Sequence, residues 1–355
     1  MAAAMGLRGI PGSAEVPTSA DKKRATGKVL RYAFAIAETG FDPSRISDQY
    51  SRTVTSHLFE APYRLDYLAR PVKMVPNTAA GMPAATNEFT TWTIRIQPGI
   101  YFADDPAFKG HPRELTAADY VYAWKRFYDP ANNSPVYSSI AQERIVGLGA
   151  LRAEAIARKR PFDYDRAVEG LVALDRYTIR CKLETPRPRF VRNLLTDNSL
   201  YGAVAREVVE FYGADRVAEH PVGTGPFRLA EWRRSAFIAL DRNPTYRMVR
   251  YDAEPASDDT AGQDLLRRFK GRRLPMIDRV EVSIIEESQP RWLSFLNNEF
   301  DLITVPLDFA NLVFSGQKLA PWLAKRGVQM PSVSIAKVRT VGKPCRLVTV
   351  PSSAM

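Results

Sequence analysis

The sequence predicts an α/β fold (mixed α+β) in which strands are covered by amphipathic helices. Residues 29–36 (VLRYAFAI) form a nearly continuous apolar run rich in β-forming residues, as expected of a strand buried on both faces. Residues 277–285, 290–298 and 301–305 predict a strand, a helix and a second strand, which is a compact βαβ unit with parallel strands. A composition of 45% hydrophobic and 25% charged residues over 355 positions is typical of a globular protein with a sizeable core.

The first 27 residues are expected to be a disordered leader. They consist largely of Gly, Pro, Ser and Ala with scattered charges. A secretory signal needs a basic start followed by an apolar run of about seven or more residues, and Arg8 and Pro11 interrupt such a run here. No signal peptide is visible in this stretch.

A turn and an amphipathic helix follow the first predicted strand. Residues 38–43 (ETGFDP) contain the Gly and Pro that favour a turn. Apolar residues then recur every four positions, at Ile46, Tyr50, Val54 and Leu58. This spacing predicts a helix with one buried face, and Ser47 is its predicted N-cap.

The middle of the chain predicts two strands and two helices. Residues 90–96 alternate between apolar and polar, as a half-buried strand does. Thr116, with Asp119 three positions later, resembles a capping box and predicts a helix start. Residues 143–158 predict a second helix, and the alternation over 177–183 predicts an edge or half-exposed strand.

Two further strands and a change in composition complete the pattern. A Gly- and Pro-containing turn at 223–227 leads into strands at 227–232 and 237–243, and a charged loop follows at 252–275. Residues 331–355 contain no acidic residue and show no helical period, so we expect a basic, disordered tail there.

The net charge of +11 does not predict nucleic-acid binding, because the charge lies at the two ends. Residues 1–30 carry +3 and the stretch after Asp308 carries +7, which leaves about +1 for the body of the chain. A basic end is usually a solvated tail rather than a nucleic-acid interface.

Enzymatic motifs are absent from the sequence. It contains no phosphate-binding, dinucleotide-binding or nucleophile-elbow glycine pattern. The adjacent carboxylates at 104–105 and 286–287 are expected to point apart and not to share a proton. Three separated histidines and two cysteines predict neither a metal site nor a disulfide scaffold, and Cys181 is interpreted as a small core residue. We therefore expect no enzymatic activity, no metal and no cofactor.

Five segments in order resemble the extracellular solute-binding proteins of family 5, the peptide- and oligopeptide-type binding proteins of ABC importers. The resemblance extends from about Lys28 to Met330, with one longer loop between Phe102 and Leu115. The segments that carry it are WTIRIQPGIYF (92–102), LTAADYV (115–121), GTGPF (223–227), DRNPTY (241–246) and IDRV (277–280).

The resemblance implies a periplasmic-binding-protein type II-like lobe with a central mixed sheet flanked by helices. It also implies a monomeric protein of the periplasm that binds a peptide or similar small solute, works with an ABC permease complex, and binds no nucleic acid. Members have two lobes that close about a hinge around the ligand. Because the match covers the first lobe only, we expect a truncation or altered reading frame near Met330 and impaired binding, with a naturally short variant as the alternative.

Ligands of open α/β sheets bind outside the carboxyl ends of the strands. The loop after the first strand, the start of the next helix and the turn at 223–227 are therefore expected to face the ligand. The candidate ligand-binding residues are Glu38, Thr39, Phe41, Asp42, Asp48, Tyr50, Thr224 and Gly225.

Structural roles are the alternative for these residues. Glu38 could hydrogen-bond its own turn, Tyr50 could be a core residue of its helix, and Thr224 with Gly225 could fix a tight turn. Two other functions also stay open: an interaction module that docks on a permease or partner without holding solute, and, ranked last, a hydrolase that uses the carboxylates.

Overall fold

The computed structural model describes residues 27–315, 318–329 and 346–349. Its central sheet is mixed, with the strand order β1-β12-β9-β8. β1 (Val29–Phe34) pairs in parallel with β12 (Arg279–Ile284), while β9 (Phe237–Arg242) pairs antiparallel with both β12 and β8 (Phe227–Arg233). This arrangement confirms the predicted fold class, a mixed sheet flanked by helices.

Helix α1 (Gln49–Leu58) follows β1, as its four-residue apolar period predicts. Its N-cap is Asp48, so the prediction of Ser47 is wrong by one position. Asp48 takes this position because its carboxylate accepts a hydrogen bond from the Ser51 N–H at 2.7 Å, which satisfies a free donor of the first turn. The buried residues of the helix include Val54 and Leu58.

A second, antiparallel sheet has the order β4-β5-β7-β6. Its strands are β4 (Ala84–Thr86), β5 (Thr91–Arg95), β6 (Leu171–Ala173) and β7 (Thr178–Lys182). An edge or half-exposed strand is predicted for the last of these segments: β7 lies inside the sheet, so it is not an edge strand, but its side chains alternate in burial as a half-exposed strand does. Cys181 on β7 is fully buried, which confirms its interpretation as a core residue.

Helices cover this second sheet. The predicted Thr116–Asp119 cap of α2 (Ala117–Arg126) is confirmed, since the Asp119 carboxylate accepts from the Thr116 N–H at 2.7 Å. The helix predicted at 143–158 is shorter in the structure. Helix α4 (Leu148–Arg158) begins after its N-cap residue Gly147, whose φ of 82° is left-handed and suits glycine. The chain between β5 and β8 also contains α3 (Tyr137–Ala141), α5 (Phe190–Leu194), α6 (Asn198–Tyr201) and α7 (Arg206–Tyr212).

Residues after β12 form a smaller unit with its own core around Trp292, Phe295 and Leu323. Its longest helix is α9 (Ser288–Leu296), and a parallel sheet has the order β13-β17-β16. The remaining elements are β13 (Leu302–Thr304), α10 (Ala310–Val313), β14 (Phe314–Ser315), β15 (Lys318–Leu319), α11 (Pro321–Lys325), β16 (Val328–Gln329) and β17 (Arg346–Thr349).

The predicted βαβ unit needs a correction. Its strand, helix and strand are all present, but β13 belongs to a different sheet from β12. β13 follows Asp301, whose N–H donates to the Arg31 carbonyl at 2.9 Å, so this segment lies beside β1. The parallel neighbour of β13 is β17, a strand at 346–349 that was not predicted. Residues 1–26, 330–345 and 350–355, which include most of the predicted leader and tail, lie outside the described residues.

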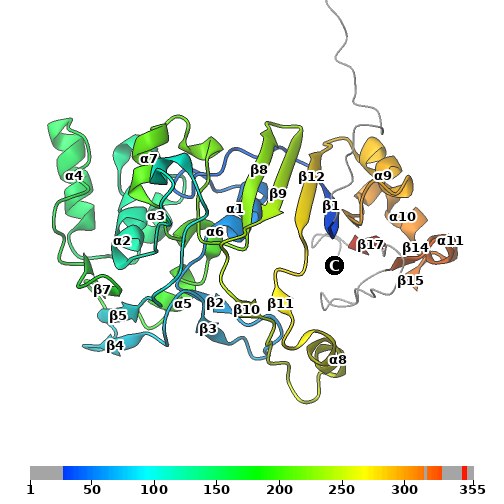
Figure 1. The fold of residues 1–355 in the computed structure, drawn as a ribbon, viewed down its shortest axis with the longest axis horizontal. Coiled ribbons are helices and arrows are strands. Elements are labelled where there is room, and N and C mark those ends of the chain that lie inside the picture. The colour runs from blue at the N-terminus through cyan, green and yellow to red at the C-terminus, as the bar shows by residue number, and fades with distance from the viewer. Residues whose placement is uncertain (1–26, 316–317, 330–345, 350–355) are drawn as a thin grey trace, which may run out of the picture.

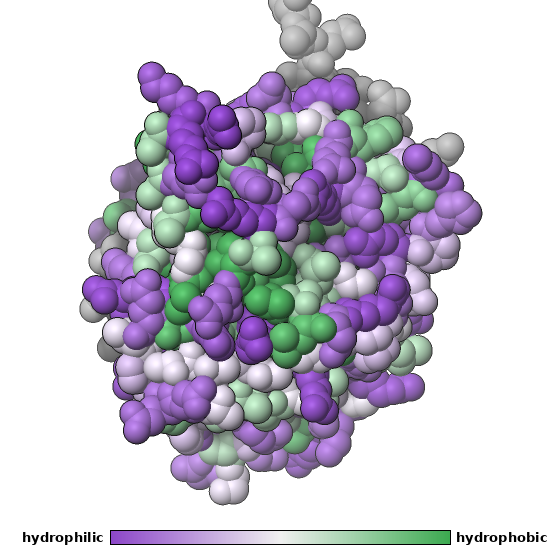
Figure 2. Space-filling model, turned by 90° about the vertical axis from the view of Figure 1, so that its left-hand side faces the viewer, coloured by the Kyte–Doolittle hydropathy of each residue, from purple (hydrophilic) through white to green (hydrophobic). Residues whose placement is uncertain are grey.

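Figure 1 shows the order of these parts along the molecule, with α4 and the antiparallel sheet at one end, the mixed sheet in the middle and α9 to α11 at the other end. A separate segment below contains β10 (Val249–Arg250), α8 (Thr260–Phe269) and β11 (Arg273–Leu274). Two short strands, β2 (Tyr63–Leu65) and β3 (Met74–Pro76), form a hairpin. In Figure 2 the end of the molecule that carries α4 shows a hydrophobic area bordered by hydrophilic side chains. No helix of the described residues is long and apolar enough to cross a membrane.

Candidate functional site

The chain that leaves the carboxyl end of β1 contacts the turn of the β8–β9 hairpin. Glu38 is the centre of this contact, and 3% of it is exposed. Its Oε1 accepts hydrogen bonds from Trp232 Nε1 at 2.5 Å and from the Ser235 N–H at 3.0 Å. The Arg234 guanidinium donates to the Thr39 carbonyl at 3.3 Å. The strand end and the hairpin turn therefore form one continuous surface, which we call the strand-end surface (residues 35–40 and 232–235).

One oxygen of Glu38 has no partner in this arrangement. Its Oε2 is buried and accepts no hydrogen bond from any described group. A buried polar atom without a partner is destabilising by about 1–3 kcal/mol, and more when the group is charged. A hydrogen-bond donor from water or from a bound molecule at this oxygen would remove that cost.

Thr39 and Asp48 extend the strand-end surface toward the start of α1. Thr39 is exposed, and its hydroxyl donates to Asp48 Oδ2 at 2.5 Å. Burial would raise the pKa of Asp48, but the hydrogen bonds from Ser51 and Thr39 outweigh it, so the pKa lies below its ordinary value. Tyr50 is half-buried, with its ring 4.6 Å from that of Phe34. This contact agrees with a core role for Tyr50 and leaves part of its ring accessible.

Phe41 and Asp42 lie in the core below this surface. Phe41 is fully buried and its ring packs 4.7 Å from that of Trp232. Asp42 forms a bidentate ion pair with Arg126, at 2.7 and 2.8 Å. Burial raises the pKa of Asp42, and the charge and hydrogen bonds of Arg126 outweigh that effect and lower it. Neither side chain is accessible to a ligand in this structure, so both support the fold here.

Thr224 and Gly225 lie at the opposite end of α1. Thr224 is buried, and its hydroxyl donates to Glu60 Oε2 at 3.0 Å. The Gly225 N–H donates to the Leu58 carbonyl at 2.9 Å, and a Cβ at this glycine would lie 2.5 Å from the His57 carbonyl oxygen. A helix rises 1.5 Å per residue, so this turn lies about 15 Å from the Asp48 end. Within this chain it therefore anchors α1 and is not part of the strand-end surface.

The structure thus brings together Glu38, Thr39 and Asp48, with Tyr50 beside them. Three hairpin residues, Trp232, Arg234 and Ser235, complete the surface and were not predicted. They are separated from Glu38 and Thr39 by more than 190 positions, so spacing along the sequence gives no signal for the contact.

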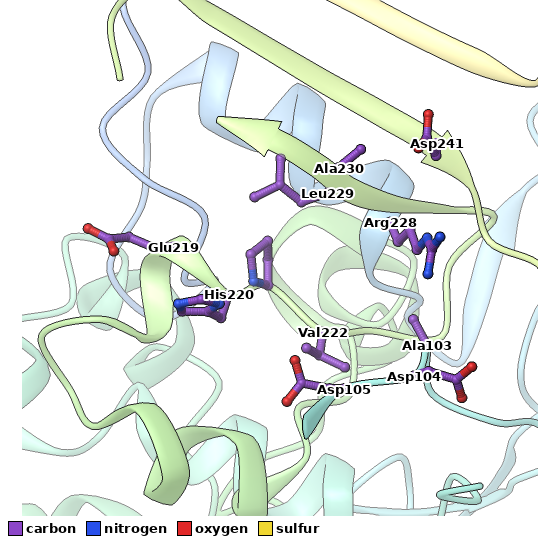
Figure 3. Close-up of a pocket in the computed structure, with 11 residues that line it drawn as sticks. Ala103, Asp104, Asp105, Glu219, His220, Val222, Arg228, Leu229, Ala230 and Asp241 are labelled. Atoms are coloured by element: carbon purple, nitrogen blue, oxygen red, sulfur yellow. The ribbon is translucent and has the colours of Figure 1, made fainter. Parts of the chain in front are cut away.

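A separate cavity of about 330 Å³ lies between the β8–β9 hairpin and two loops (Figure 3). Asp104 and Asp105 point in different directions in it, as their adjacency predicts. Asp105 accepts from the Tyr212 hydroxyl at 3.0 Å, and the Tyr212 ring stacks on His220 at 3.7 Å. The lining residues are Ala103, Asp104, Asp105, Glu219, His220, Pro221, Val222, Arg228, Leu229, Ala230 and Asp241.

The part of the chain that the structure describes contains no group of three or more His, Cys, Asp or Glu side chains that could hold a metal ion. The carboxylates near the strand-end surface and in the cavity are instead held mainly by arginine, tyrosine and backbone groups. What these groups can do chemically is accept and donate hydrogen bonds.

The family model for "Bacterial extracellular solute-binding proteins, family 5 Middle" matches residues 73–334. The periplasmic oligopeptide-binding protein OppA of Salmonella typhimurium is 29% identical over 208 residues, which cover 58% of this chain and 34% of that protein. Di/tripeptide-binding protein 2 of Pseudomonas aeruginosa is 25% identical over 244 residues, 66% of this chain and 41% of its own length.

Solved structures show the same fold. Haemophilus influenzae OppA in complex with the peptide RPPGFSPFR superposes with a TM-score of 0.60 at 22% identity, covering 81% of this chain and 48% of that one. Listeria monocytogenes OppA bound to peptide gives a TM-score of 0.62 at 19% identity, and the match covers 82% of this chain and 49% of that one. The chain therefore spans about half the length of these structures, and a third to two-fifths of the two relatives above.

Proposed function

Because this chain belongs to the bacterial extracellular solute-binding proteins of family 5, we propose that it acts in the substrate-binding component of an ABC importer for peptides or related solutes. Relatives named as oligopeptide-binding and di/tripeptide-binding proteins support a peptide as the solute. The OppA protein of Salmonella typhimurium is named as periplasmic, which supports a periplasmic location for this chain too. Its proposed partner is a membrane permease complex.

The observation that carries this proposal is the strand-end surface. It lies at the carboxyl end of a sheet strand, which is where ligands of open α/β sheets bind. It presents an exposed Thr39, with Trp232 held beside it by a hydrogen bond to the buried Glu38. We assign direct ligand contact to Thr39, whose exposed hydroxyl would accept a hydrogen bond from an N–H group of an extended peptide, and to the buried Glu38 the role of holding Trp232 beside it.

The other candidates support this surface in the proposal. Asp48 fixes the Thr39 hydroxyl, and Tyr50 borders the surface. Phe41 and Asp42 hold the loop from below, and Thr224 with Gly225 holds the far end of α1. This chain would supply one wall of a cleft, and closure of a second lobe about a hinge would supply the other.

A single wall is expected to bind weakly. Ligand affinity depends on contacts with both lobes, and losing ~4 kcal/mol of them weakens binding about a thousandfold. Impaired binding by this chain alone is therefore part of the proposal.

The test is equilibrium dialysis of the full chain against a pool of short peptides, with the retained peptides measured by mass spectrometry. We expect weak retention of intact peptides, reduced in Thr39→Val. Thr86→Val is the matched control, since it removes the same hydroxyl from an exposed position on β4 in the other sheet. Cleaved peptides, or equal retention by both variants, would contradict the proposal.

A lone-lobe interaction module is the second candidate, and one observation favours it: the end of the molecule that carries α4 shows a hydrophobic area, the kind of surface that a partner covers (Figure 2). Such a module would dock on a permease or another partner without holding solute. It would show no retained peptide in the dialysis but would bind the purified permease complex.

A further inference from the structure

The C-terminal half of α8 and the turn after it form a strongly basic segment outside the candidate site. Residues 265–274 contain five cationic residues and no acidic one. We call these five the α8 basic surface: Arg267, Arg268, Lys270, Arg272 and Arg273. All but Arg268 are exposed, and the Arg267 side chain is 77% accessible. Figure 1 shows α8 with β10 and β11 at the lower edge of the molecule, apart from the other helices.

Acidic residues of the same region neutralise only part of this surface. Asp264 pairs with Arg267, and Glu254 is held by Lys73 at 2.6 Å. Asp259 caps the opposite end of α8, where it accepts from the Gly262 N–H. Asp252 and Asp258 also precede the helix.

Three cations of the surface are unpaired. Within the described residues, Lys270, Arg272 and Arg273 form no ion pair with a carboxylate. All three lie beyond Phe269, the last residue of α8. A helix C-terminus is stabilised by cations within its last turn, and Arg267 and Arg268 already serve that purpose.

Aromatic side chains connect the α8 basic surface to the partly exposed ring of Tyr67. Tyr67 stacks on Tyr251, with ring centroids 6.0 Å apart, and Tyr251 meets the edge of Phe269 at 6.0 Å. The Arg272 guanidinium lies over Phe269 at 5.3 Å. Tyr67 is 53% exposed, and Met248, directly before β10, is 59% exposed. Cationic and amphipathic side chains thus share one region of the surface.

We propose that the α8 basic surface docks on an anionic phospholipid bilayer. Unpaired Lys and Arg attract lipid phosphates, and partly exposed Tyr and Met suit the boundary between headgroups and acyl chains. Exposed Tyr and Met beside unpaired cations is the combination that suits a membrane interface, and we therefore commit to lipid as the occupant. The inference is independent of solute binding and concerns a different part of the chain.

The test measures sedimentation of the full chain with phosphatidylcholine vesicles, with and without phosphatidylglycerol. We expect binding only when phosphatidylglycerol is present, and weaker binding as salt is raised. The variant K270Q/R272Q/R273Q should bind about tenfold more weakly or worse. The matched control R158Q/K159Q/R160Q removes three exposed cations from the end of α4 and should bind as the unaltered chain does. Circular dichroism melting checks that both variants fold.

Three results would overturn the inference. The first is no binding of the unaltered, folded chain to phosphatidylglycerol vesicles. The second is an equal loss of binding in the α4 control, which would show a response to net charge alone. The third is binding to soluble polyglutamate but not to vesicles, which would assign the surface to an acidic protein partner.

Discussion

Asp42 and Arg126 form a buried bidentate ion pair that joins the loop after β1 to helix α2. Their side chains are 0% and 2% exposed, and the two hydrogen bonds measure 2.7 and 2.8 Å. Asp42 Oδ1 also accepts from the Ser44 N–H and hydroxyl, so each carboxylate oxygen has at least one hydrogen-bond donor. The pair fixes the position of the loop that carries Glu38 and Thr39.

Replacing Asp42 by alanine should destabilise the protein strongly, because it leaves the Arg126 charge buried without a partner. We expect a loss of about 3–5 kcal/mol in the free energy of unfolding, measured by urea denaturation. Glu154→Ala removes the half-buried surface partner of Arg158 and Arg166 and should cost at most ~1 kcal/mol. Similar losses in the two variants would contradict the assigned role of Asp42.

The Asp42–Arg126 pair should make the free energy of unfolding depend on pH in the acid range. Asp42 has a pKa below its ordinary value of 3.8 in the folded chain. Its contribution is therefore fully present above that ordinary value and is lost as the pH falls through the lower, folded value. Urea denaturation across this acid range should show a steep decrease in the unmodified chain and a smaller one in Asp42→Asn. Parallel pH profiles for the two would refute this linkage.

Cys181 should be chemically silent while the protein is folded. Burial raises the pKa of its thiol to about 12, so the reactive thiolate is almost absent near neutral pH. In a Cys345→Ser background, a thiol reagent should modify Cys181 only after urea is added. Rapid labelling of the native chain would show that β7 opens readily or that Cys181 is less buried than described.

Two glycines offer a matched test of the turn at 223–227. Gly225→Ala would place a Cβ 2.5 Å from the His57 carbonyl oxygen, whereas Gly149→Ala in α4 meets nothing within 4 Å. We expect Gly225→Ala to lower the thermal midpoint and Gly149→Ala to leave it unchanged or raise it slightly, since alanine favours helix by about 1 kcal/mol. Equal midpoints would mean that the turn does not press on the end of α1.

Local signals in the sequence predicted much of the fold. The apolar run of β1, the Thr116–Asp119 cap of α2 and the two strands after the 223–227 turn are all present. Each of these elements is encoded by residues within a few positions of one another. The motifs that resemble family 5 predicted the mixed sheet in the same way.

Long-range contacts could not be predicted from those signals. Asp301 lies beside Arg31, 270 positions away, and β13 belongs to a different sheet from β12, which the local βαβ pattern could not indicate. Glu38 and Trp232 meet only because the β8–β9 hairpin turn folds against the end of β1. Glu38, Thr39 and Asp48 could be proposed from the strand-end rule, but their hairpin partners could not.

The most direct test of the central claim is hydrogen–deuterium exchange of the full chain with and without a retained peptide. We predict slower exchange in segments 35–42 and 232–236, which form and flank the strand-end surface, and no change in the antiparallel sheet. Protection confined to other regions, such as the cavity beside His220, or no protection at saturating peptide, would contradict a solute-binding role for this surface.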